Sequence, residues 1–261
     1  MPVVKPANPR LRRLDGAPSL WLACPGPRRT FGGDAGDVGD LAGNTPALVR
    51  PPSATWATGP YGPAVAFDGA PVPLPFTVTG PNLTLSIRFR LSQPAGGFYG
   101  LFTTRDDGFC GLAFTGSGGN ICGSWNATVG EYNSGPQMPV LPGVPYQAVM
   151  TLSPTLLVSY LFNLASGAVD SYAIPGTYGP RPLRNWGLGG DPGIPDRSNR
   201  GIFDDVRHYP RGLSAAEVAR EVADPYWRLH AATRVAPFLQ ASPAFRPWLA
   251  RPALVLGSGV S

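Results

Sequence analysis

Hydrophobic and polar residues alternate most regularly in the segment LTLSIRFRL, Leu83–Leu91. Its odd-numbered positions hold only Leu, Ile and Phe, whereas its even-numbered positions hold Thr, Ser and Arg. Side chains of a β-strand point alternately to opposite faces, so this pattern places all the apolar side chains on one face. The segment is therefore predicted to be a half-buried strand, with its apolar face in the core and its polar face toward solvent.

Several other segments have the length and composition of strands and are bounded by turn-forming clusters such as GSGG at 116–119. Segments 146–152 and 155–163 are predicted to form a hairpin around the Ser-Pro pair at 153–154. The other expected strands are 98–103, 108–114, 120–125, 168–174 and 186–190. This number of strands suits two packed antiparallel sheets.

The segment 201–224, GIFDDVRHYPRGLSAAEVAREVAD, changes from a strand period to a helix period across a turn. Its first part, 201–209, is expected to be a closing strand. Strict alternation divides the side chains of this strand into two faces, Ile202, Asp204, Val206 and His208 on one and Phe203, Asp205, Arg207 and Tyr209 on the other. Neither face is purely apolar.

The second part of this segment carries the signals of a short helix. Pro210 ends the strand, and Ser214 stands at the position of a helix N-cap. Glu217 follows three residues later, which is the spacing of a capping box. The pattern predicts a helix at 215–222 that ends before Pro225.

This strand, turn and helix resemble the end of the LamG-like jelly-roll domain of the concanavalin A-like superfamily, whose closing strand reads roughly hDDVRIYNRALSAAEV, with h apolar. The stretches DLAGNTPALV at 40–49 and WATGPYGPAVAFDG at 56–69 resemble two earlier motifs of the same family, with a departure at 45–47. The resemblance covers about residues 18–227. It implies an all-β fold, a two-sheet antiparallel jelly-roll sandwich with one short C-terminal helix.

Composition agrees with this fold. The 34 Gly and 32 Pro among 261 residues disfavour long helices and favour many short strands. At 27.4 kDa the chain can bury one sizeable core. We therefore expect a single sandwich domain at 18–227, between a basic, proline-rich arm at 1–17 and a proline-rich, apolar arm at 228–261.

The C-terminal arm is too apolar for a free solvated segment. It is expected either to pack on the sandwich or to lie along a neighbouring subunit as an assembly arm, through Phe238, Leu239, Phe245, Trp248, Leu249 and Leu254. The junction DPYWRL at 224–229 resembles the Pro-Trp-x-Leu ending of LamG-like proteins from phage and prophage structural gene clusters. This resemblance implies that the protein is part of a phage or phage-like particle.

Charge and hydropathy exclude other classes of partner. The net charge is +5, but the basic residues are mostly single arginines scattered along the chain, so a nucleic-acid surface is not expected. No apolar run approaches the roughly 20 residues of a membrane span. Residues 1–17 lack the apolar core of a secretory signal, so synthesis in the bacterial cytoplasm without a signal peptide is expected.

The spacing of carboxylates argues against a glycosidase, which needs two cooperating carboxyl groups. Glu217 and Glu221 belong to the predicted helix, which leaves Glu131 as the one glutamate of the sandwich. The adjacent pairs at 106–107 and 204–205 either point to opposite faces of a strand or lie in a turn.

The cysteines and histidines do not indicate catalysis either. His208 and His230 are accompanied by no G-x-S-x-G motif, so we expect no enzyme. Cys24, Cys110 and Cys122 lack the spacing of a zinc site. Cys110 and Cys122 could form a disulfide on adjacent strands, although buried free thiols are the preferred interpretation.

Two kinds of binding site are considered. LamG-like sandwiches often hold calcium through oxygen ligands, and the matching positions here are Asp40, Asn44, Asp68, Asp204 and Asp205. The alternative is that these residues cap turns, so a structural calcium ion is not required. A glycan site would combine aromatic platforms with amide groups, for which the candidates are Trp125, Asn126, Tyr132, Asn133, Tyr178 and Trp186, the two tryptophans being equally suited to the core.

Two functions of different class follow. The first is a non-catalytic structural protein: a sandwich displayed on the surface of a phage or phage-like virion as a capsid decoration or tail-associated protein. Its arms would anchor it to a capsid or tail protein, and a homo-oligomer is expected. The alternative is a carbohydrate-binding or adhesin module that recognises cell-surface glycans.

Overall fold

The computed structural model describes residues 20–23, 39–40, 55–59, 62–74, 77–115, 119–125 and 134–224, and the statements below concern these residues. They form two main antiparallel sheets, two small strand pairs and one helix, α2 (Ala215–Ala223). Both arms, 1–17 and 228–261, with all six predicted assembly side chains of the second, lie outside the described residues. No helix in the described part of the chain is long and apolar enough to cross a membrane.

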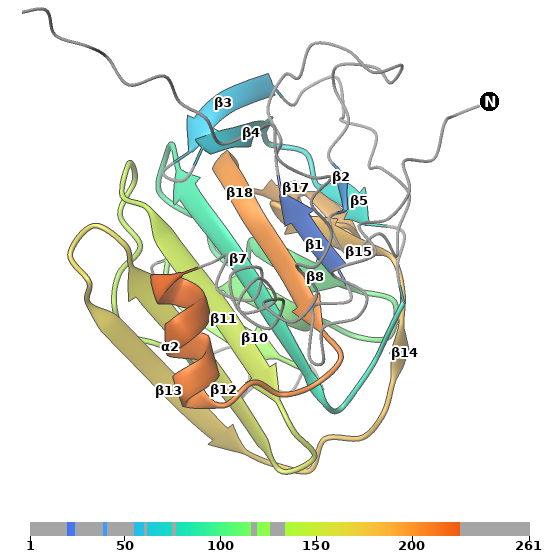
Figure 1. Cartoon of the computed structure of the whole chain (residues 1–261). Helices are drawn as coiled ribbons and strands as arrows, with labels where there is room; N and C mark the ends of the chain where they lie inside the picture. Colours follow the sequence, from blue (N-terminus) through green and yellow to red (C-terminus); the bar gives the residue numbers. More distant parts are fainter. Residues whose placement is uncertain are drawn as a thin grey trace, which may run out of the picture.

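The large sheet has nine antiparallel strands (Figure 1). Its main path runs β13–β12–β11–β7–β18–β1–β2. Strand β4 joins the sheet by pairing with β18, and β3 pairs with β4. The strands are β1 (Leu20–Ala23), β2 (Gly39–Asp40), β3 (Thr55–Gly59), β4 (Gly62–Asp68), β7 (Leu83–Leu91), β11 (Tyr146–Leu152), β12 (Leu156–Asn163), β13 (Val169–Pro175) and β18 (Arg200–Tyr209).

The small sheet has five strands in the order β10–β9–β8–β15–β5. They are β5 (Val72–Leu74), β8 (Gly100–Thr104), β9 (Cys110–Phe114), β10 (Ile121–Ser124) and β15 (Trp186–Leu188). Two short pairs complete the architecture, β6 (Val78–Thr79) with β14 (Pro182–Leu183) and β16 (Gly190–Asp191) with β17 (Ile194–Ser198).

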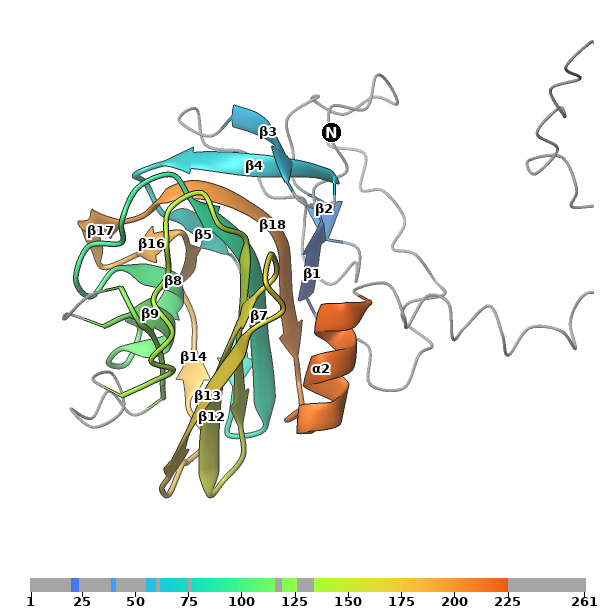
Figure 2. The same ribbon diagram turned by 90° about the vertical axis from the view of Figure 1, so that its left-hand side faces the viewer.

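The two sheets enclose one large hydrophobic core, and α2 packs on the opposite, outer face of the large sheet (Figure 2). The predicted all-β sandwich with one short C-terminal helix is therefore confirmed, and its architecture is consistent with a jelly roll. The predicted hairpin is also confirmed, because the whole of β11 pairs with residues 157–163 of β12. The expected strand at 186–190 is divided into β15 and β16 by Gly189, whose φ of 71° ends the extended run.

Strand β7 has the predicted bounds, and Leu85, Ile87 and Phe89 lie in the core as expected. The prediction of a solvated polar face is wrong, because Ser86 and Arg88 on that face are also buried. The outer face of the large sheet is covered by α2 and by a second, smaller apolar cluster, which comprises Val149, Phe162, Tyr209, Leu213 and Val218. Arg88 on this face is thus buried beneath α2.

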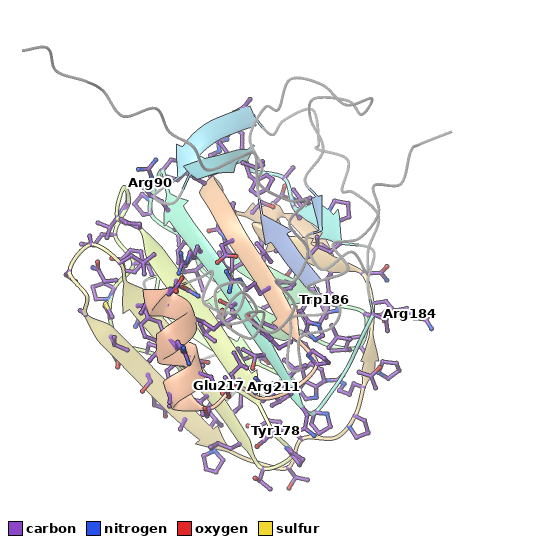
Figure 3. The ribbon with its side chains drawn as sticks, viewed as in Figure 1. Arg90, Tyr178, Arg184, Trp186, Arg211 and Glu217 are labelled. Atoms are coloured by element: carbon purple, nitrogen blue, oxygen red, sulfur yellow. The ribbon has the colours of Figure 1, made fainter. Side chains whose placement is uncertain are left out.

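The start of α2 confirms the predicted capping box. The Ser214 hydroxyl accepts a hydrogen bond from the Glu217 backbone N–H at 3.3 Å, and the Glu217 carboxylate accepts one from the Ser214 N–H at 3.0 Å. Arg211 also donates to Glu217 and, together with Ser214, lowers the pKa of Glu217 to about 2. Arg211 and Glu217 lie side by side at the N-terminal end of α2 (Figure 3).

A buried charge cluster, made of Arg88, Asp205, Arg207 and Glu221, joins α2 to the sheet. Arg207 donates two hydrogen bonds to Asp205, at 2.9 and 2.8 Å, and is ion-paired with Glu221. The Nε of Arg88 lies 3.7 Å from the Oδ2 of Asp205. Its Nη2 donates to the main-chain oxygens of Glu221 and Val222 near the end of the helix. Two arginines and two carboxylates make the cluster formally neutral, which is a condition for burying charges.

Strand β18 contains a β-bulge that the alternating pattern did not predict. Phe203 pairs with Phe89, and the next register pair is Asp205 with Arg88, so the chain carries one extra residue between them. As a result Phe203 and Val206 both lie in the core, although strict alternation places them on opposite faces. The bulge lies where the partner of β18 on one edge changes from β4 to β1.

Cys110 and Cys122 are buried free thiols, so the disulfide alternative is wrong. Cys122 lies opposite Ala113 on the neighbouring strand rather than opposite Cys110. Burial raises the pKa of Cys122 to about 12, which keeps this thiol protonated and unreactive. Cys24 lies outside the described residues.

Candidate ligand-binding rim

The aromatic residues predicted to stack on sugars do not form a platform. Trp125 and Trp186 are completely buried and Tyr178 is 3% exposed, and all three belong to the core. Their polar atoms donate to main-chain oxygens, the indole nitrogens to Gly179 and Leu183 and the Tyr178 hydroxyl to Ile174. The prediction is corrected for these three side chains, because a ring packed between two sheets cannot contact a sugar. Asn126, Tyr132 and Asn133 lie outside the described residues.

Two of the residues predicted to bind calcium, Asp68 and Asp205, have described side chains, and these lie apart. Asp205 is buried and bound to Arg207, and Asp68 forms an exposed ion pair with Arg200 at 3.0 Å. Asp68 pairs with position 200 of β18, five residues from Asp205, which separates the two carboxylates by roughly 15 Å of strand.

The other predicted calcium ligands give no support. Asp40 is placed by its backbone in β2, whereas the side chain of Asp204 and the whole of Asn44 lie outside what the structure describes. Among the described residues no group of three or more His, Cys, Asp or Glu could hold a metal ion. The structure therefore does not bring Asp68 and Asp205 together as calcium ligands, since an arginine lies beside each carboxylate. The part of the calcium prediction that depends on Asp40, Asn44 and Asp204 stays a prediction.

A different set of polar side chains gathers at one end of the sandwich. We call residues 105–109 and 181–185 the rim. The first segment is the turn between β8 and β9, and the second includes β14 and leads into β15. Both segments are held at the same end because β15 and β8 are antiparallel neighbours, with Gly187 paired to Thr103.

Asp106 fastens the two segments of the rim together. Its carboxylate accepts hydrogen bonds from the Arg184 backbone N–H at 2.9 Å and from the Asn185 side-chain amide at 3.2 Å. The Asp106 backbone N–H donates to the Thr104 hydroxyl at 3.1 Å. The adjacent acidic pair at 106–107 thus lies in a turn, one of the two placements that the sequence left open.

Asp107 makes the second connection. Arg181 donates to its carboxylate from Nε at 3.1 Å and forms an ion pair with it at 2.8 Å. The same guanidinium donates to the Trp125 main-chain oxygen at 2.6 Å. The end of β10 is therefore tied to the rim, and Asn126, a predicted glycan ligand, is the next residue in the chain.

The turn at Arg184 and Asn185 is held from several sides. Leu183 before it and Trp186 after it are completely buried, and the Trp186 indole closes the turn on the Leu183 oxygen. The Thr104 hydroxyl donates to the Arg184 oxygen. Asn185 has a φ of 51°, in the left-handed region that Asn tolerates better than most residues. These contacts direct the side chains of Arg184 and Asn185 to solvent, and Arg184 extends away from the ribbon beside β14 (Figure 3).

Arg105 connects the rim to the β16–β17 hairpin. Its Nε lies 2.5 Å from the carboxylate of Asp191, which is completely buried. The guanidinium also lies over the Phe109 ring, 5.1 Å from the ring centre. The rim therefore presents carboxylate, guanidinium and amide groups on a backbone fixed by contacts between segments far apart in sequence.

Sequence reasoning did not identify this rim as a site. Its one signal was the Asp-Asp-Gly run at 106–108, which is typical of a turn. The partners of Asp106 lie 78 and 79 positions away, and no local pattern pairs them. The rim offers fixed hydrogen-bond donors and acceptors but encloses no metal cluster among its described residues.

Comparison with solved structures shows a shared fold. Domain 4 of AbnA, an extracellular arabinanase from Geobacillus stearothermophilus in complex with arabinotriose, is 17% identical, with a TM-score of 0.52 over 71% of this chain and 92% of that chain. Trypanosoma rangeli sialidase in complex with sialic acid is 14% identical, with a TM-score of 0.54 over 80% of this chain and 33% of the sialidase. The chain thus spans about a third of that enzyme.

The binding domain of Paraclostridial Mosquitocidal Protein 1 is 14% identical, with a TM-score of 0.52 over 80% of this chain and 52% of that one. No family model matches the sequence, and no curated protein matches it. The chain therefore shares a β-sandwich fold with domains of a sialidase, an arabinanase and a toxin.

Proposed function

We propose that this chain is a non-catalytic carbohydrate-binding module whose ligand contacts the rim. The observation that carries the proposal is the clamp at Asp106, which holds Arg184 and Asn185 in an exposed turn through two hydrogen bonds to one carboxylate. The similarity to a β-sandwich domain in complex with arabinotriose supports a sugar as the ligand. Fold similarity alone does not assign a function, so the hydrogen-bonding groups of the rim carry the proposal.

The chemistry of the rim suits a ligand that is rich in hydroxyl groups. A sugar hydroxyl both donates and accepts hydrogen bonds, and exposed Asp, Asn and Arg side chains offer both roles. Sites bind well when these groups are positioned before the ligand arrives, because less conformational entropy is then lost on binding. The Asp106, Asp107 and Arg105 contacts provide such positioning.

The described glutamates and the described histidine support a function without catalysis. Glu217 is bound by Arg211 and Ser214, with a pKa lowered to about 2, and Glu221 is buried against Arg207. Burial lowers the pKa of His208 to about 4 and removes it from solvent. General acid–base catalysis needs a group that reaches the substrate and titrates near the working pH.

The finer assignment to the concanavalin A-like superfamily is part of this proposal. It is supported by the motif at 201–224, which forms the strand, turn and capped helix that the resemblance implies. Display on a virion and attachment through the arms, capsid or tail partners and homo-oligomerisation depend on residues 1–17 and 228–261. They stay predictions, because those residues are not described.

The proposal is tested by a glycan array followed by calorimetry with the sugars that bind. Asp106→Ala is expected to weaken binding by at least about tenfold, since it removes two hydrogen bonds worth about 1 kcal/mol each from the turn. Asp68→Ala is the matched control, because Asp68 is also exposed and lies beside an arginine but outside the rim. Absence of binding to any sugar, or equal losses in the two variants, would refute the proposal.

A further inference from the structure

We propose that the rim recognises an anionic group on its sugar, a carboxylate or a sulfate, through the guanidinium of Arg184. This inference rests on the proposed carbohydrate-binding function and specifies its ligand. Arg184 differs from the other described arginines in the contacts of its guanidinium. Arg184 is exposed, and its guanidinium makes no hydrogen bond or ion pair with any described residue. Its backbone N–H donates to Asp106, and its backbone oxygen accepts from Thr104.

The other described arginines are engaged. In the rim, Arg105 binds Asp191 and Arg181 binds Asp107. Elsewhere, carboxylates bind Arg88, Arg200, Arg207 and Arg211, an aromatic ring contacts Arg197, and further interactions involve Arg90 and Arg220. A guanidinium has five donors in a planar fork that matches a carboxylate or a sulfate. No described residue occupies the guanidinium donors of Arg184, which makes this arginine the candidate for contact with a ligand.

The backbone beneath Arg184 is fixed although its side chain is exposed. Buried residues flank the turn, and Asp106 binds it at two points. Asn185 adopts a left-handed backbone conformation, which costs most residues free energy. The root of the Arg184 side chain is thus placed before a ligand arrives, which lowers the entropy lost on binding.

The adjacent amide distinguishes an acidic sugar from a simple anion. The side-chain nitrogen of Asn185 donates to Asp106, whereas its side-chain oxygen has no recorded partner among the described residues. This oxygen can accept a hydrogen bond from a sugar hydroxyl beside the anionic group. The pair offers a charged donor and a neutral acceptor on neighbouring residues, which suits a molecule that carries both an anionic group and hydroxyl groups.

Local charges make the recognition short-ranged. Arg105 with Asp191 and Arg181 with Asp107 form two neutral pairs, and Asp106 balances Arg184 in formal charge. Together with Asp191, which lies outside the rim, these described charges sum to zero and create no net positive field that would attract anions from a distance. The Asp106 carboxylate accepts hydrogen bonds from N–H donors of the turn. An anionic group of the ligand can therefore bind the Arg184 guanidinium. Binding should then depend on the planar fork, which lysine cannot reproduce.

Calorimetry on the full chain tests this inference with trigalacturonate, sialyllactose and galactose sulfate. Each probe is matched with an uncharged counterpart, the methyl ester of trigalacturonate, lactose and galactose. At least one acidic sugar should bind about tenfold or more tightly than its counterpart, because a charge-assisted hydrogen bond is stronger than a neutral one. Arg184→Ala should abolish this preference, and Arg184→Lys should restore little of it. Arg200→Ala, at an exposed arginine outside the rim, should leave it unchanged.

The outcomes separate this inference from the proposed function. If neutral sugars bind the rim as tightly as acidic ones, or if Arg184→Ala keeps the preference, the anionic ligand is refuted while carbohydrate binding stands. If no sugar binds, both proposals are refuted. Whether the carboxylate or the sulfate probe binds better identifies the anionic group. Arg184→Ala keeps the backbone contacts of the turn, so thermal unfolding of this variant should match that of the unmodified chain.

Discussion

Replacing Arg207 with Met should strongly destabilise the fold, because it leaves buried carboxylates without their counterion. Arg207 is bound to Asp205 and Glu221, and all three side chains are almost completely inaccessible to solvent. Burial alone lowers the pKa of Arg207, but the negative charges of Asp205 and Glu221 outweigh burial and hold this pKa above its ordinary value. The arginine is therefore charged in the folded state, and its removal changes the cluster from neutral to a formal charge of −1.

Removing one partner of a buried ion pair costs about 3–5 kcal/mol, which is a large part of the roughly 5–15 kcal/mol that stabilises a typical domain. The double variant Arg207→Met with Glu221→Met should recover much of this loss. In that variant Arg88 and Asp205, 3.7 Å apart, remain as a neutral pair, and apolar side chains fill the place of the other two charges.

Urea unfolding followed by circular dichroism measures these free energies, and the two single variants with the double variant form a double-mutant cycle. A loss below about 1 kcal/mol for Arg207→Met, or additive losses in the double variant, would contradict a mutually dependent buried cluster.

Three further predictions concern stability. Burial lowers the pKa of His208 from 6.5 to about 4, so the unfolded state binds more protons between these values. Stability should therefore fall as the pH drops from 6.5 to 4, and His208→Gln, which cannot titrate, should lack this slope in a pH series of urea unfolding. Ser214→Ala should cost about 1 kcal/mol by removing the helix cap at Glu217, and an equal stability of both proteins would exclude a capping role. Gly135→Ala should lower the melting temperature, because its new methyl group would overlap the main-chain oxygen of Ile121, and an unchanged melting curve would show that this approach is absent.

The sequence predicted local elements well because their signals are local. The alternation at 83–91 and the capping box at Ser214 and Glu217 correspond to the observed β7 and the start of α2. Alternation indicates which side chains share a face, but it does not indicate what covers that face. Arg88 therefore belongs to a polar face as predicted, and yet it is buried beneath α2 by residues more than 130 positions away.

Other features depend on geometry that composition does not record. The bulge near Asp205 shifts the register by one residue, and a strict period of two cannot reveal such a shift. Trp125 and Trp186 suit a core and a sugar platform equally well by residue type, and the packing of the two sheets decides for the core. The rim is assembled by contacts between Asp106 and the turn at Arg184, which depend on the pairing of β8 with β15.

The position of β18 sets the order in which the chain can fold during synthesis. This strand, residues 200–209, lies between β7 on one edge and β4 and β1 on the other (Figure 1). Leu20, made early, pairs with His208, made near the end of the described chain. Until β18 leaves the ribosome, β7 and β4 have open edges, which are templates for aggregation. A nascent chain that is released before residue 200 therefore lacks the strand that unites the large sheet, and such fragments should accumulate as insoluble protein.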